Sequence, residues 1–128
     1  MSNEAQQRQI IESYVKAYNA FDVAGMVKDM HHDIVFENIA DGITNHKILG
    51  ISAFLHQAEQ ATAYFREREQ RIKSISFEED VAEVEVSYSG VVGVDLPNGM
   101  QAGEELTLEG KSIFYFENGK ITKLQDIS

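Results

Sequence analysis

Apolar residues in the first part of the chain recur with helical spacing. They form one stripe over residues 4–21, which predicts an amphipathic helix. The stripe consists of Ile10, Ile11, Tyr14, Val15, Ala17, Tyr18 and Phe21. Asp22 is a suitable N-cap for a short second helix over residues 23–30. Beyond a polar loop at residues 41–50, a third amphipathic helix is expected from Ile51 to about residue 66 or 67, with Phe65 on its apolar face.

Strand patterns dominate the rest of the chain. A short β-branched run predicts a strand over residues 33–38, and period-two patterns predict strands over residues 70–77, 81–94, 104–116 and 120–127. Asn118-Gly119 suits a type I′ hairpin between the last two strands, and residues 96–100 form a looser turn. The expected order is ααβαββββ, which predicts one α+β domain over residues 1–128.

Two of the predicted strands are apolar on both faces. Residues 112–116 and the valines at positions 91, 92 and 94 lack the alternation expected of an antiparallel strand with one face in water. Helices would cover one face, and a second subunit is the simplest cover for the other. We therefore expect a homodimer that forms through the sheet.

Composition and charge narrow the range of functions. The 128 residues include no cysteine, which excludes disulfides, thiolate zinc sites and a cysteine nucleophile. The formal charge of −10 argues against nucleic acid and anionic membranes as partners. Residues 1–9 are polar, and no apolar run approaches the ~20 residues of a membrane span. We expect a soluble, cytoplasmic protein.

The segment from Tyr14 to Asn38 resembles the opening of ketosteroid isomerases and SnoaL-like polyketide cyclases, of the nuclear transport factor 2-like superfamily. The resemblance rests on Tyr14-Val15-Lys-Ala17-Tyr-Asn19-Ala20-Phe-Asp22, followed by Gly25, Val27, Asp33 and Glu37-Asn38. Further along, Gly50, Ala53 and Phe54 and the strand order match in pattern. The resemblance implies a strongly curved sheet wrapped around the helices, with a deep apolar pocket.

It also implies roles for three residues. Ketosteroid isomerases use an aspartate as general base and an oxyanion hole of one tyrosine and one protonated aspartate. The tyrosine falls on Tyr14, the base on Asn38, and the second oxyanion-hole residue approximately on Ser112. A carboxamide takes up no proton near neutral pH, so Asn38 can orient a substrate but cannot be the base.

A base must therefore be another carboxylate. Asp126 shares a strand face with Leu124, and Asp41 follows Asn38 in the adjacent loop. Burial in an apolar pocket would raise the pKa of either side chain toward neutral pH, although both also fit as solvated surface charges. Other side chains are expected to bind the substrate, namely Tyr18, Phe36, His46, Tyr88, Ser112 and Phe114.

The sequence does not indicate a bound cofactor or metal. It has no phosphate-binding glycine loop and no nucleophile elbow. His31-His32-Asp33 is the one group with metal-ligand chemistry, but adjacent histidines at the end of a helix usually point apart. We expect no cofactor and no metal.

Two kinds of function remain open. One is an enzyme without cofactor, an isomerase or cyclase (or a related lyase or hydrolase), that acts on a small apolar carbonyl compound through an enolate-like intermediate. The alternative is a non-catalytic module that binds a small ligand or assembles as a dimer. Loss of both family carboxyl groups favours the module, whereas Tyr14 and an inward Asn38 favour the enzyme.

Overall fold

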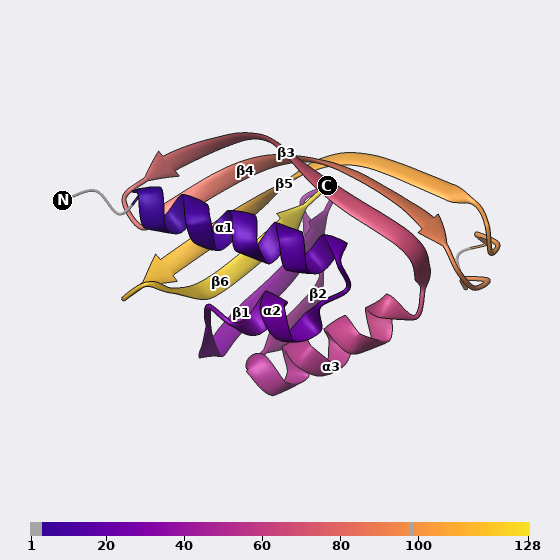
Figure 1. Cartoon of the computed structure of the whole chain (residues 1–128), viewed down its shortest axis with the longest axis horizontal. Coiled ribbons are helices and arrows are strands. Elements are labelled where there is room, and N and C mark those ends of the chain that lie inside the picture. The colour runs from indigo at the N-terminus through magenta and orange to yellow at the C-terminus, as the bar shows by residue number, and fades with distance from the viewer. Residues whose placement is uncertain (1–3, 98) are drawn as a thin grey trace.

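A computed structural model describes residues 4–97 and 99–128, and shows three helices and six strands (Figure 1). The helices are α1 (Glu4–Asn19), α2 (Val23–Val27) and α3 (Ile51–Thr62). The strands are β1 (Met30–Ala40), β2 (Ile43–Leu49), β3 (Phe65–Glu78), β4 (Val81–Val92), β5 (Glu105–Glu117) and β6 (Lys120–Ile127). The α+β class and the early placement of the helices are confirmed.

The six strands form one curved, unclosed sheet in the order β2-β1-β6-β5-β4-β3. All neighbours pair antiparallel except β1 and β6, which run parallel, so the sheet is mixed rather than purely antiparallel. Figure 1 shows α1 lying across one face beneath the arch of β3, β4 and β5, with α2 and α3 below it. The helices therefore share the concave face.

The core lies between α1 and this concave face. Ile11 from the apolar stripe of α1 is fully buried, as are Ile34 and Leu124 from the strands. Phe114 is 1% exposed and packs edge-on against Tyr14, with ring centroids 5.7 Å apart. The inward residues of β1, β6 and β5 thus form the floor on which α1 rests.

The predicted loop at residues 41–50 is wrong, because it contains strand β2. Only Ile48 of β2 is buried, since β2 is an edge strand that backbone pairing with β1 holds in place. Too few of its side chains enter the core to give a hydrophobic period. The second and third predicted helices are too long. Helix α2 ends at Val27 instead of residue 30, and α3 ends at Thr62 instead of residue 66 or 67, because β3 begins at Phe65.

Two local predictions are confirmed. The Asp22 side chain accepts a hydrogen bond from the Gly25 amide at 3.0 Å and caps α2. Asn118 and Gly119 have φ values of 52° and 77°, as a type I′ hairpin requires. Residues 1–3 of the polar N-terminal segment and Asn98 of the predicted turn at 96–100 lie outside the described residues.

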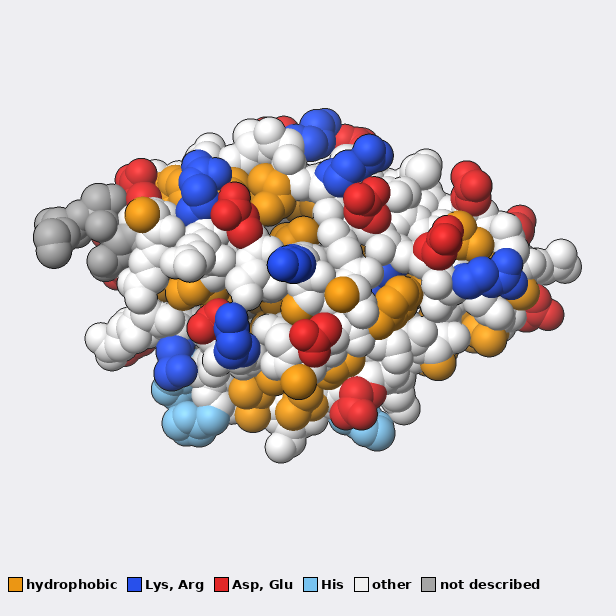
Figure 2. All heavy atoms as spheres, viewed as in Figure 1, with side chains coloured by type: hydrophobic (Ala, Val, Ile, Leu, Met, Phe, Trp, Pro, Cys, Tyr) orange, Lys and Arg blue, Asp and Glu red, His pale blue; other side chains and the backbone are white. Residues whose placement is uncertain are grey.

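The surface carries charges of both signs, as Figure 2 shows for one face. Among the described residues, no helix is both long and apolar enough to cross a membrane.

Candidate functional site

Four polar side chains lie side by side across four neighbouring strands. In the sheet register, His46 of β2 is opposite Asn38 of β1, Asn38 is opposite Asp126 of β6, and Asp126 is opposite Ser112 of β5. Paired residues on adjacent strands project to the same face. This polar row therefore faces the helices, next to the apolar row formed by Phe36, Leu124 and Phe114.

Asp126 is the acidic residue of this row, and its pKa is raised. Its side chain is partly buried, and burial raises the pKa of Asp126 from 3.8 to about 6. The Ser112 hydroxyl donates a 2.7 Å hydrogen bond to Oδ1, which stabilises the carboxylate and limits the rise of the pKa. At pH 7 the group is mostly ionised yet basic enough to accept a proton from carbon.

Tyr14 presents a phenol to the same site. The residue is 6% exposed, and its hydroxyl forms no hydrogen bond with any described residue. Burial, and next the negative charge of Asp126, raise the pKa of the Tyr14 phenol, so the hydroxyl stays protonated and can only donate or accept as a neutral group. A buried donor of this kind fits an oxygen on which negative charge develops.

Tyr14 and Asp126 both line a cavity of about 310 Å³ between the sheet, α1 and α3. Its walls are mostly apolar, and the charged groups among the lining residues come from the sheet. The lining residues are Tyr14, Tyr18, Met26, Phe36, Asn38, His46, Ile48, Phe54, Gln57, Ala58, Ala61, Phe65, Arg68 and Asp126. A second hollow of about 240 Å³ shares Tyr18, Asn38 and Asp126 with the cavity.

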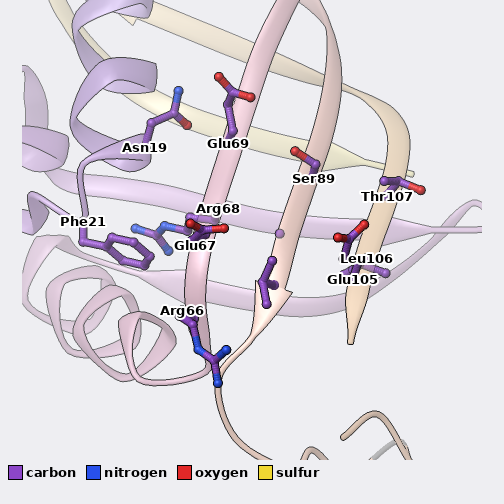
Figure 3. Close-up of a pocket in the computed structure, with 12 residues that line it drawn as sticks. Asn19, Phe21, Arg66, Glu67, Arg68, Glu69, Ser89, Glu105, Leu106 and Thr107 are labelled. Carbon is purple, nitrogen blue, oxygen red and sulfur yellow. The ribbon is translucent and has the colours of Figure 1, made fainter. Parts of the chain in front are cut away.

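A larger hollow of about 550 Å³ lies at the end of α1 over β3, β4 and β5 (Figure 3). Exposed glutamates line it, among them Glu67, Glu69 and Glu105. None of the paired polar row reaches it, and Arg68 is the one residue that it shares with the 310 Å³ cavity. The 550 Å³ hollow is the larger of the two, but the acid–base groups converge in the 310 Å³ cavity. The 310 Å³ cavity is therefore the candidate functional site.

The structure gathers most of the expected site residues. Six of them line the 310 Å³ cavity: Tyr14, Tyr18, Phe36, Asn38, His46 and Asp126. Tyr88 and Ser112 line the adjoining hollow. His46 is exposed and so lies at the rim, whereas Phe114 is buried behind Tyr14 and lines neither.

Asp41 lies apart from these residues. It is exposed in the turn between β1 and β2, with a φ of 54°, and lines neither hollow. The β1–β2 hairpin turns here instead of carrying the chain over the cavity, so Asp41 is not positioned to act as a base.

His31, His32 and Asp33 lie together at the start of β1, with possible ligand atoms within 4.8 Å. The histidine rings stack at 4.3 Å, and Nδ1 of His31 already accepts a hydrogen bond from the Asp33 amide. The group lines neither hollow, and nothing else in the described residues points to a metal there.

Sequence reasoning missed Arg68. Residue 68 falls between a predicted helix that ends at residue 66 or 67 and a predicted strand that begins at residue 70, so the sequence pattern assigns Arg68 to no face. Arg68 has the same strand parity as the partly buried Ile72, and that parity was the available signal. Other missed cavity residues are apolar or small, apart from Gln57 on α3.

The chain has a curved sheet that encloses the helices, with a cavity and the polar row between them. It is a protein of the nuclear transport factor 2-like superfamily. Residues 11–124 match the SnoaL-like domain, and the chain belongs to that family. A search of curated proteins finds no match.

Solved structures share the fold at low sequence identity. A proposed polyketide cyclase from Xanthomonas campestris pv. campestris is 18% identical with a TM-score of 0.83, over 99% of this chain and 93% of that one. A SnoaL-like polyketide cyclase from Jannaschia sp. CCS1, also proposed, is 11% identical with a TM-score of 0.82, over 95% and 84%. An LEH-like epoxide hydrolase from M. tuberculosis is 17% identical with a TM-score of 0.76, over 96% and 82%.

Proposed function

We propose that the protein is a cofactor-independent isomerase or cyclase that acts on a small apolar carbonyl compound through an enolate-like intermediate. The observation that carries the proposal is the placement of Asp126, with a pKa raised to about 6, in one cavity with the protonated phenol of Tyr14. A base and an oxyanion donor in one cavity are the two groups that enolisation requires.

Each step has a residue to perform it. The Asp126 carboxylate removes a proton from the carbon next to the carbonyl, and the C–H electron pair moves into the enolate. Tyr14 donates a hydrogen bond to the enolate oxygen, while Asn38 and Ser112 orient the substrate and the base. In an isomerase, Asp126 returns the proton to another carbon. In a cyclase, the enolate carbon attacks the carbon of a second carbonyl group in the same molecule, and Asp126 protonates the alkoxide oxygen that forms.

The oxyanion site can be tested with a planar phenol, 2-naphthol, as an analogue of the enolate. Fluorescence titration is practical because the protein has no tryptophan. We expect Tyr14→Phe to weaken binding by ~1–3 kcal/mol, the effect of removing one buried hydrogen bond. The matched control is Tyr115→Phe, since Tyr115 lies on β5 but bonds to Gln125 outside the cavity. Equal binding by the native protein and Tyr14→Phe would contradict the proposed role of Tyr14.

The base can be tested by hydrogen exchange of 2-tetralone in D₂O, followed by proton NMR. We expect the native protein to accelerate loss of the α-proton signals, Asp126→Asn to abolish the acceleration, and Asp41→Asn to leave it unchanged. Acceleration that survives Asp126→Asn would exclude Asp126 as the base. Phenol binding that depends on Tyr14, without any exchange, would favour the alternative of a non-catalytic ligand-binding module.

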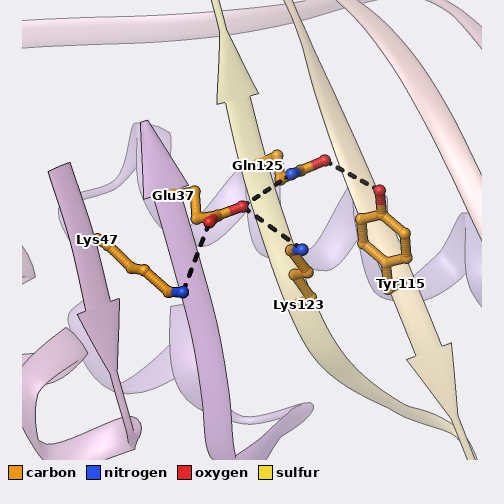
Figure 4. A network of polar contacts seen from close by, with 5 residues as sticks. All are labelled: Glu37, Lys47, Tyr115, Lys123 and Gln125. Atoms are coloured by element: carbon orange, nitrogen blue, oxygen red, sulfur yellow. Dashed lines mark hydrogen bonds and ion pairs between the residues drawn. The ribbon is translucent and has the colours of Figure 1, made fainter. Parts of the chain in front are cut away.

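We also propose that the chain forms a homodimer through the outer face of the sheet. On this face Glu37 accepts a 2.8 Å hydrogen bond from Gln125 and lies near Lys47 and Lys123 (Figure 4). The Gln125 bond, followed by the two lysines, lowers the pKa of Glu37, so the carboxylate is ionised and its charge is compensated within the chain. A face with compensated charges next to exposed Leu49 suits contact with a second copy. Sedimentation equilibrium at micromolar concentration should give twice the monomer mass.

A further inference from the structure

Arg68 is a buried cation that the proposed mechanism leaves without a role. The residue is 6% exposed, projects from β3 toward Phe21 and the helices (Figure 3), and lines the 310 Å³ cavity. Within the described part of the chain Arg68 forms no ion pair. The glutamates on either side of it along β3 are exposed and project to the other face.

Few of its hydrogen-bond donors are used. Nε donates to the Tyr18 carbonyl at 2.9 Å, and Nη2 lies 3.9 Å from Sδ of Met26, a weak acceptor. No bond to Nη1 is formed by any described residue. The guanidinium carbon lies 3.8 Å from the ring centroid of Tyr18 and 4.6 Å from that of Phe21. The guanidinium therefore lies against two aromatic rings, and such contacts leave the N–H donors of an arginine free to bind a ligand in the plane of the group.

A buried guanidinium stays charged, and leaving it without an anion in an apolar site is costly. The aromatic contacts offset only part of that cost. Because Arg68 lines the cavity that holds Tyr14, an anionic group on a ligand in this cavity can complete the ion pair. Carboxylate geometry matches the fork of N–H donors.

We propose that the substrate is an apolar keto acid, whose carboxylate binds Arg68 while its carbonyl binds Tyr14. This assignment rests on the proposed function, and it narrows the substrate from apolar carbonyl compounds in general to those that carry a carboxylate. Arg68 then sets specificity and orientation, and Asp126 acts on the carbon next to the carbonyl.

Electrostatics at Tyr14 agree with this division. Burial is the main cause of the raised pKa of the Tyr14 phenol, the negative charge of Asp126 raises this pKa further, and the positive charge of Arg68 lowers it. A keto acid presents its two oxygen functions to the Tyr14 and Arg68 side of the cavity and its C–H bond to Asp126.

The test compares binding of 2-naphthol, 6-hydroxy-2-naphthoate and the methyl ester of that acid to the native protein. All three carry the phenol, but only the acid carries a charge at pH 7. We expect the acid to bind about 10- to 100-fold more tightly than the ester. Arg68→Met should remove this preference, whereas Arg66→Met, which replaces an exposed arginine on the same strand, should preserve it.

Equal binding of acid and ester by the native protein would overturn the proposal, and so would a preference that survives Arg68→Met. If Arg68→Met fails to fold, Arg68→Lys provides the second variant, because it keeps the charge but not the fork and should reduce the preference several-fold. Tyr14-dependent binding of 2-naphthol without any acid preference defeats this inference alone. Absence of 2-naphthol binding defeats the proposed function as well.

Discussion

Replacing Asp126 by asparagine should stabilise the protein at pH 7 while it removes the proposed base. Asparagine has nearly the same shape, and its carbonyl oxygen can still accept the 2.7 Å hydrogen bond that Ser112 donates to Asp126. What the substitution removes is a carboxylate that burial disfavours, as shown by the rise of its pKa to about 6.

The magnitude follows from the difference between the native and unfolded pKa values. Below pH 3.8 the carboxyl group is protonated in both states, and between 3.8 and about 6 only the unfolded state ionises, so the free energy of unfolding falls as the pH rises. Above pH 6 the loss approaches its full value of about 3 kcal/mol, because each tenfold difference in proton affinity between the two states corresponds to about 1.36 kcal/mol. Since the side chain is only partly buried, solvent screening reduces the expected gain for Asp126→Asn at pH 7 to about 1–3 kcal/mol.

Urea unfolding of the native protein and Asp126→Asn, at intervals from pH 4 to pH 8, measures this gain directly. The stability difference between the two proteins should widen as the pH rises through the interval from 3.8 to 6 and then stay constant. Asp41→Asn is the matched control, because Asp41 is an exposed aspartate away from the cavity. A difference that does not change with pH, or an Asp126→Asn variant less stable than the native protein at pH 7, would refute the reasoning.

Three further substitutions probe how the site is held. Ser112→Ala removes the hydrogen bond that lowers the pKa of Asp126, so the pH profile of 2-tetralone exchange should shift to higher pH. Gly110→Ala would place a Cβ atom 2.6 Å from the carbonyl oxygen of Ile127. This substitution should lower the free energy of unfolding, measured in urea, by about 1–3 kcal/mol. An unchanged stability would contradict the close approach of β5 and β6. Phe114→Ala removes most of a large buried side chain and should lower the free energy of unfolding by about 3–5 kcal/mol in the same measurement; a loss below about 1 kcal/mol would show that Phe114 is not a core residue.

The fold was largely predictable because most elements bury one regular face. The stripe that includes Ile11 and Tyr14 determines α1, and the apolar run that includes Phe114 lies in β5, with Phe114 on its buried face. Strand β2 was not predictable in the same way, since Ile48 is its single buried residue and backbone pairing holds the strand in place. Strands β1 and β6, which pair parallel to each other, are far apart in the sequence, and local patterns do not encode such pairing.

The candidate site was predictable only in part, for a related reason. Strand parity indicates that Asn38, Ser112 and Asp126 face inward, but only the register between strands brings them into one row. No local signal fixes that register. The same limit explains why Asp41 was wrongly expected in the site and Arg68 was missed. Asp41 is close to Asn38 along the chain but not in the cavity. Arg68 has charged neighbours along the chain, yet it faces inward on β3.

Asp126 and Arg68 share one physical feature that bears on function. Each is an ionisable group that lines the same cavity, and in the described residues neither has an ion-pair partner that would compensate its charge. A chain selected for stability alone would hold neutral residues at both positions. Both charges act on the phenol of Tyr14. The proposed ligand explains why the chain keeps them, because its carboxylate would compensate Arg68 and its C–H bond would give a proton to Asp126.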